Sequence, residues 1–105
     1  MEPTVGRIVH YRLSKRDAEQ INRRRTDGAS IAKRITAEKW PVGAQAHIGN
    51  TVREGDSLPL LIVAINSVTS INGQVFLDGN DTFWAISVSE GPEAGQWSWP
   101  EIKRN

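Results

Sequence analysis

The chain has 105 residues, no cysteine and a formal net charge of +1 at pH 7. A chain of this length supports one domain, residues 1–105, with one core and little room for a large catalytic cleft. The lack of cysteine excludes disulfides, thiolate zinc sites and cysteine nucleophiles. No apolar stretch is long enough to cross a bilayer, so we expect a soluble protein without a membrane partner.

The charge is distributed unevenly along the chain. Residues 1–34 contain nine Lys or Arg and four Asp or Glu, whereas residues 35–105 contain four and eight. The near-neutral total therefore combines a basic first third with an acidic remainder. This pattern predicts a cationic segment displayed on a more acidic scaffold.

The first elements predicted are a strand and a helix. Residues 5–13 alternate and are rich in β-branched and aromatic side chains, which is typical of a strand. Ser14 follows as an N-cap, with Asp17 three positions later in a weaker form of the Ser-x-x-Glu capping box. A helix is therefore expected over residues 15–26, with a thin apolar stripe that leaves its arginines in solvent.

Helical character continues beyond that segment. After an Asp-Gly break, residues 30–38 resume the helical pattern, either as a second short helix or as the continuation of one kinked helix. Residues 14–40 are therefore predicted to form a helical insertion, and residues 42–57 a glycine-rich loop. Long loops in small domains often carry function.

The remainder of the chain is predicted to be β-structure. Residues 58–65 are apolar on both faces, which is typical of a central strand. Asn72 and Gly73 predict a turn, and so does the Asp-Gly-Asn-Asp segment 78–81. Further strands are expected at residues 74–77, 82–88 and 96–100. The predicted fold class is mainly β with a helical insertion (α+β): a small SH3-like barrel of about five strands, with a helix-rich insertion after the first strand.

Several segments together carry a resemblance to a known group of proteins. The segments are residues 4–11, 21–25, 47–50, 74–81 and 97–101. They resemble those of small phage and prophage proteins of unassigned function, and the resemblance covers nearly the whole chain. The shared segments include no catalytic motif. The resemblance implies a context, the host bacterial cytoplasm, in which small phage accessory proteins often counter host defence, bind host enzymes or occupy nucleic acid.

The arginine-rich part of the first helix is the main candidate binding site. Asn22, Arg23, Arg24 and Arg25 predict an anion clamp, because guanidinium groups bind phosphate oxygens in a bidentate manner. The alternative is a solvated helix surface with no ligand. A short helix with so little apolar stripe gains little stability from packing, which favours the clamp.

Other polar and aromatic residues complete the predicted site. Tyr11 is expected beside the helix, where it would stack on a base, or else pack locally in its strand. His47 and Asn50 lie in a loop whose glycine allows close approach to a ligand, although a plain surface loop explains them equally well. Trp84 is either a further stacking surface or a core or rim residue of the barrel.

The sequence offers little support for a catalytic site or a metal-binding site. Only His10 and His47 are available as imidazole ligands, and they lack a recognised spacing or a third ligand. Asp78 and Asp81 are explained by a β-turn without acid–base chemistry. We therefore expect no metal, no cofactor, no catalytic residue and no enzymatic activity.

The favoured function is that of a phage-type accessory binding protein. It would act as an anti-defence sponge that sequesters a small anionic nucleotide immune signal without cleaving it, as a homo-oligomer whose subunits help to enclose the ligand. One alternative is an SH3-like inhibitor or adaptor that binds a host protein. Another is an Arg-rich nucleic-acid binder, against which the acidic second half of the chain counts.

Overall fold

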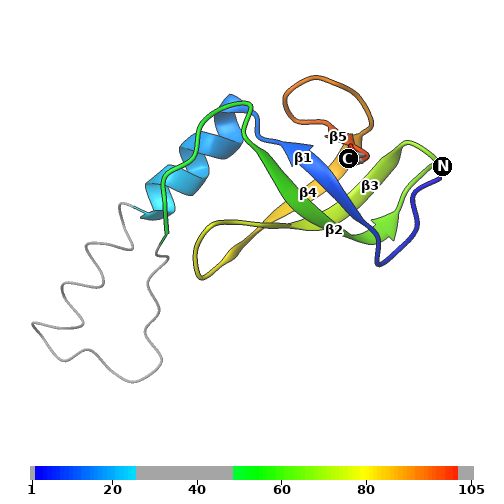
Figure 1. Cartoon of the computed structure of the whole chain (residues 1–105), viewed down its shortest axis with the longest axis horizontal. Coiled ribbons are helices and arrows are strands. Elements are labelled where there is room, and N and C mark those ends of the chain that lie inside the picture. The colour runs from blue at the N-terminus through cyan, green and yellow to red at the C-terminus, as the bar shows by residue number, and fades with distance from the viewer. Residues whose placement is uncertain (1, 26–48, 102–105) are drawn as a thin grey trace, which may run out of the picture.

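The computed structural model describes residues 2–25 and 49–101 and shows a curled antiparallel sheet with a helix beside it (Figure 1). The sheet has five strands in the order β4-β3-β2-β1-β5. Their bounds are Ile8–Arg12 for β1, Ser57–Ile65 for β2, Ser70–Phe76 for β3, Thr82–Ser89 for β4 and Trp97–Ser98 for β5.

The two ends of the sheet approach each other. β4 and β5 are its edge strands, yet Glu90, directly after β4, forms a parallel bridge with Trp97 of β5. This contact curls the sheet into a half-barrel whose concave side encloses the core. Curling of this kind protects edge strands that would otherwise remain unpaired.

The core follows from the alternation of side chains along the strands. Val9 in β1 pairs with Leu60 in β2, Leu60 with Val75 in β3, and Val75 with Phe83 in β4. The first three of these side chains are fully buried. Paired residues share one face of a sheet, so this row marks the inner face. The flanking residues of each strand point to the outer face.

The helix starts where the sequence predicts. The Ser14 hydroxyl accepts a hydrogen bond from the backbone N–H of Asp17 (3.1 Å), and the Asp17 carboxylate accepts one from the backbone N–H of Ser14 (3.1 Å). This reciprocal pair is a capping box in which aspartate takes the place of glutamate. Residues 15–25 are helical, and Ala18 and Ile21 bury their side chains in the core.

The predicted turn at Asn72 and Gly73 is wrong, because both residues lie inside β3. Gly73 pairs with Ile62 and with Ala85, and a Cβ atom at this position would lie 2.2 Å from Leu60 Cδ2. The glycine therefore serves close packing inside the barrel, not a change of chain direction. The chain turns earlier, at residues 66–69.

The fold class is confirmed at its coarser level: a mainly β, five-stranded small barrel-like domain with a helix after β1. The predicted turn at residues 78–81 is also confirmed, since it joins β3 to β4. Residues 26–40 of the predicted insertion and residues 42–48 of the predicted loop lie outside the described residues. In the described ranges, no helix is long and apolar enough to span a membrane.

Candidate functional site

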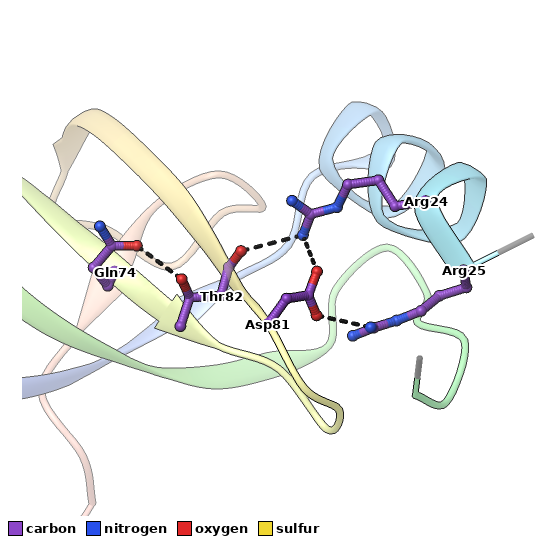
Figure 2. A network of polar contacts seen from close by, with 5 residues as sticks. All are labelled: Arg24, Arg25, Gln74, Asp81 and Thr82. Atoms are coloured by element: carbon purple, nitrogen blue, oxygen red, sulfur yellow. Dashed lines mark hydrogen bonds and ion pairs between the residues drawn. The ribbon is translucent and has the colours of Figure 1, made fainter. Parts of the chain in front are cut away.

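The arginine segment of the helix meets the β3–β4 turn in a network of polar contacts (Figure 2). Asp81 bridges two guanidinium groups: its Oδ2 lies 2.8 Å from Arg24 Nη2, and its Oδ1 lies 2.7 Å from Arg25 Nη1. Arg24 Nη2 also donates a hydrogen bond to the Thr82 carbonyl oxygen (3.2 Å). The Thr82 hydroxyl in turn donates to Gln74 Oε1 (3.1 Å), which extends the network onto β3.

The network is largely buried and carries excess positive charge. The side chain of Arg25 is 4% exposed and that of Asp81 9%, whereas that of Arg24 is 33% exposed. Among the described residues, one carboxylate faces two guanidinium groups, which leaves a formal charge of about +1 on these three side chains. Over the described part of the chain, Nε and Nη2 of Arg25 are buried without a hydrogen-bond partner.

The segment at residues 49–50 is fastened to the same turn. The backbone N–H of Asn50 donates to the Asp78 carbonyl oxygen (3.1 Å), and its side-chain amide donates to the Asp78 carboxylate. Gly49 forms a bridge with Gly79, and a Cβ atom at Gly49 would lie 2.2 Å from the Asp78 carbonyl oxygen. The same Cβ would lie 3.0 Å from Arg25 Cζ. Glycine at position 49 therefore lets the turn and the helix meet.

The other two residues of the arginine segment have different environments. Asn22 forms a pair of hydrogen bonds with the backbone of Val52: its side-chain amide donates to the carbonyl oxygen, and its Oδ1 accepts from the N–H, both at 2.8 Å. This amide holds the helix to the chain that enters β2. Arg23 is exposed.

A groove lies between the N-terminal half of the helix and β4. It encloses about 270 Å³ and is lined by Tyr11, Arg16, Asp17, Gln20, residues 83–88 and Gly95. On its floor the Tyr11 hydroxyl donates a hydrogen bond to the Asp17 carboxylate. Arg16 and Gln20 are exposed side chains on the helix wall. The groove therefore offers a cation and an amide above an aromatic floor.

The groove and the arginine network are neighbours. Arg16, Gln20 and Arg24 are spaced four residues apart, so they share one face of the helix. Arg24 Cζ lies 5.8 Å from the centroid of the Phe83 ring, and Phe83 is also a groove residue. Phe83 thus joins the groove to the Arg24–Asp81 pair, and the two features form one elongated candidate site.

The structure brings together only part of the set predicted from the sequence. Tyr11 lies in the groove, Arg24 and Arg25 lie beside it, and His47 lies outside the described residues. Trp84 is among the residues that line the groove, and its pairing with Gln74 places it in the outer row of β4. The inward-facing aromatic residue of this strand is Phe83.

Several residues of the site were not predicted from the sequence, among them Arg16, Gln20, Phe83 and Asp81. Arg16 and Gln20 have a visible signal, the four-residue spacing that places them in line with Arg24. Asp81 was assigned only to a turn, and a turn aspartate gives no sign of a distant arginine partner. Its role emerges only when the turn meets the helix.

The ionisation of Tyr11 provides a test of this geometry. Burial raises the pKa of Tyr11 above its ordinary value, and both the hydrogen bond to Asp17 and the negative charge of that carboxylate raise it further. Because the pKa of Tyr11 is higher in the folded than in the unfolded state, the protonated phenol stabilises the folded protein. This stabilisation is complete below the unfolded-state pKa of about 10 and is lost as the pH rises toward the folded-state pKa. Tyr11 is the chain's one tyrosine, so phenolate absorbance reports on it alone.

We therefore expect no phenolate signal from the folded protein near pH 10, and its appearance only at higher pH or on alkaline unfolding. The free energy of unfolding should fall over the same pH range in the wild type but less in Tyr11→Phe, measured by urea titration at several pH values. An ordinary phenolate midpoint in a still-folded protein would contradict the buried pair.

The region shows no arrangement typical of a metal centre. Among the residues in the described ranges, no group of three or more His, Asp or Glu side chains is placed to hold a metal ion. The carboxylate in the groove, Asp17, already accepts hydrogen bonds from the Tyr11 hydroxyl and the Ser14 backbone. Comparisons with protein-family models, with curated proteins and with solved structures found no match.

Proposed function

We propose that this protein is a non-catalytic binding protein that captures a small anionic ligand of nucleotide type. The observation that carries the proposal is the continuous site along one helix face, in which Arg16 and Gln20 line the groove and Arg24 lies over Phe83 at its end. Nucleotide sites commonly combine an apolar wall for the base with a few positioned polar groups for the phosphate.

The dimensions of the groove favour a ligand of limited size. Its volume of about 270 Å³ lies just under the usual range for small-molecule pockets, which starts at about 300 Å³. The ring of Phe83 supplies a wall for a base, while the guanidinium groups of Arg16 and Arg24 supply donors for phosphate oxygens. A duplex would need an extended basic surface instead.

The proposal includes sequestration without bond cleavage. The hydrogen bonds that Asp17 accepts leave it poorly placed to act as a free general base. The resemblance of the sequence segments to phage and prophage proteins supports a role as an anti-defence sponge for a nucleotide immune signal in a bacterial host. In that role, tight binding alone is sufficient.

A second candidate is an SH3-like adaptor for a host protein. The strand order β4-β3-β2-β1-β5 and the bridge from Glu90 to Trp97 support the SH3-like assignment. β4 is an edge strand beside the groove, so an extended peptide would find both unpaired backbone groups and an apolar channel. Binding of a host peptide in this way does not require a phosphate group on the ligand.

Calorimetric titration with cyclic dinucleotides, cyclic trinucleotides, ADP-ribose derivatives and inorganic phosphate tests the proposal. We expect one nucleotide class to bind and to be recovered unaltered. Arg16→Ala should weaken that binding about tenfold or more, since a charge-assisted hydrogen bond contributes about 1.5–3 kcal/mol. Arg53→Ala, an exposed arginine away from the groove, is the matched control.

The outcomes separate the candidate functions. Equal affinity in the wild type and Arg16→Ala would place the ligand elsewhere, and no binding in the whole panel would overturn the nucleotide proposal. Recovery of a host protein that competes for the groove would support the adaptor. A mobility shift with oligonucleotides that weakens steeply with salt would support nucleic-acid binding.

A further inference from the structure

The outer face of the sheet exposes several large apolar side chains, and one of its residues, Trp84, also lines the groove. Ile8 of β1 pairs with Leu61 of β2, Leu61 with Gln74 of β3, and Gln74 with Trp84 of β4. This outer row runs beside the buried inner row that contains Val9, and it crosses four strands. Ile8 is 54% exposed and Trp84 is 46% exposed.

A second line of outer residues has the same character. His10 pairs with Pro59, and Phe76 pairs with Thr82. Phe76 is 44% exposed. With the row from Ile8 to Trp84, these residues form what we call the outer patch: Ile8, His10, Pro59, Leu61, Gln74, Phe76, Thr82 and Trp84.

The eight residues of the outer patch include no Lys, Arg, Asp or Glu, although the chain contains 25 such residues among its 105, as 13 basic and 12 acidic side chains. Arg12, the next outward residue of β1, lies at the edge of the patch and donates a hydrogen bond to the Pro92 carbonyl oxygen. Charged residues are depleted in the cores of protein interfaces, and aromatic residues are enriched there. A charged partner or an anionic membrane surface would find no counter-charge on this patch. An uncharged face, in contrast, meets an identical face without repulsion.

From these observations we infer that the outer patch binds a second copy of this chain, sheet to sheet, around a two-fold axis. In such an isologous contact, a residue of one copy meets a second residue of the other copy, and the reverse pair forms on the far side of the axis. An axis that passes between β2 and β3 would set Trp84 of one copy against Ile8 of the other, and Phe76 against Pro59. Each pair sets a larger side chain against a smaller one across the contact.

The area of the sheet is sufficient for a reversible dimer. Strands lie about 4.8 Å apart and rise about 3.3 Å per residue, so four strands over about seven residues each, a face that extends beyond the outer patch, have a flat area of roughly 450 Å². Two copies in contact over this whole face would bury roughly 1,000 Å² once side-chain relief is included, which is the lower limit for a specific interface. We therefore expect a dimer that depends on protein concentration.

Sedimentation velocity over a range of protein concentrations tests this inference. The wild type should pass from monomer to dimer as its concentration rises, and Phe76→Lys and Ile8→Lys should each shift the midpoint at least tenfold upward, because a buried charge opposes association. The matched control is Val68→Lys, which changes an apolar residue that is 62% exposed in the β2–β3 turn, outside the outer patch.

The results would distinguish a dimer formed through the outer patch from a monomer. A wild type that stays monomeric up to about 1 mM, or a dimer that Phe76→Lys and Ile8→Lys leave intact, would overturn the inference. Circular dichroism of each variant would show whether it folds.

Because the chain has no cysteine, Gln74→Cys provides a second readout: a short bifunctional maleimide should link two copies near the axis. Phe76 and Ile8 do not line the groove. Ligand binding can therefore be measured in these variants independently of dimer formation.

Discussion

Replacing Asp81 with asparagine is expected to lower the free energy of unfolding by about 3–5 kcal/mol, the range found when one partner of a buried ion pair is removed. The asparagine has nearly the same shape but no charge. It would leave the guanidinium group of Arg25, whose side chain is 4% exposed, without its counter-charge. Urea unfolding followed by tryptophan fluorescence measures the change.

Two further variants separate charge from shape in this experiment. Asp78→Asn alters the neighbouring turn aspartate, which is exposed and contacts Asn50, and should change the free energy of unfolding by less than about 1 kcal/mol. Adding Arg25→Met to Asp81→Asn should recover much of the loss, because the buried unpaired charge is then gone. Equal small losses for Asp81→Asn and Asp78→Asn would show that the network contributes little to stability.

Trp97→Ala is the second substitution with a large expected effect. Trp97 is fully buried, its indole N–H donates to the Thr69 carbonyl oxygen (3.0 Å), and its ring meets that of Trp99 edge to face at a centroid distance of 5.5 Å. Truncation to alanine should lower the free energy of unfolding by about 3–5 kcal/mol through lost burial and an unfilled cavity. The curl of the sheet should weaken as well, since Trp97 also bridges Glu90.

The matched control for this prediction is Trp84→Ala, in the same residue type at a position that is 46% exposed. In dilute protein it should change the free energy of unfolding by about 1 kcal/mol or less, because half of the ring already faces solvent. Thermal and urea unfolding of both variants provide the comparison. A similar loss in both variants would argue against Trp97 as the closing residue of the half-barrel.

The candidate site changes how the arginine segment is understood. The sequence suggests that Arg23, Arg24 and Arg25 act alike, but the structure gives them three environments: solvent, a half-buried ion pair and a buried ion pair. Arg24 is the accessible member of the pair that holds Asp81. The cation that lines the groove, Arg16, lies two turns earlier on the same helix face.

Much of the fold was predictable because it depends on local signals. Side-chain alternation identified β1, a run that is apolar on both faces identified β2, and the turn signal at 78–81 located the start of β4. The Ser14–Asp17 pair identified the start of the helix. The Asp-Gly-Asn-Asp segment correctly predicted a turn. At Asn72 and Gly73 the local signal failed, because strand pairing and the need for space beside Leu60 outweighed the turn preference of the dipeptide.

Apart from the turn expected at Asn72 and Gly73, the sequence by itself determined which segments become strands or helix, because these properties follow from neighbours within a few positions. The tertiary structure alone decided the partners of the polar side chains: Asp81 for Arg24 and Arg25, and the Val52 backbone for Asn22. It also decided that Phe83 lies both in the groove and beneath Arg24. These outcomes depend on strand register and on contacts between distant segments, which form only when the sheet curls and the helix packs against it.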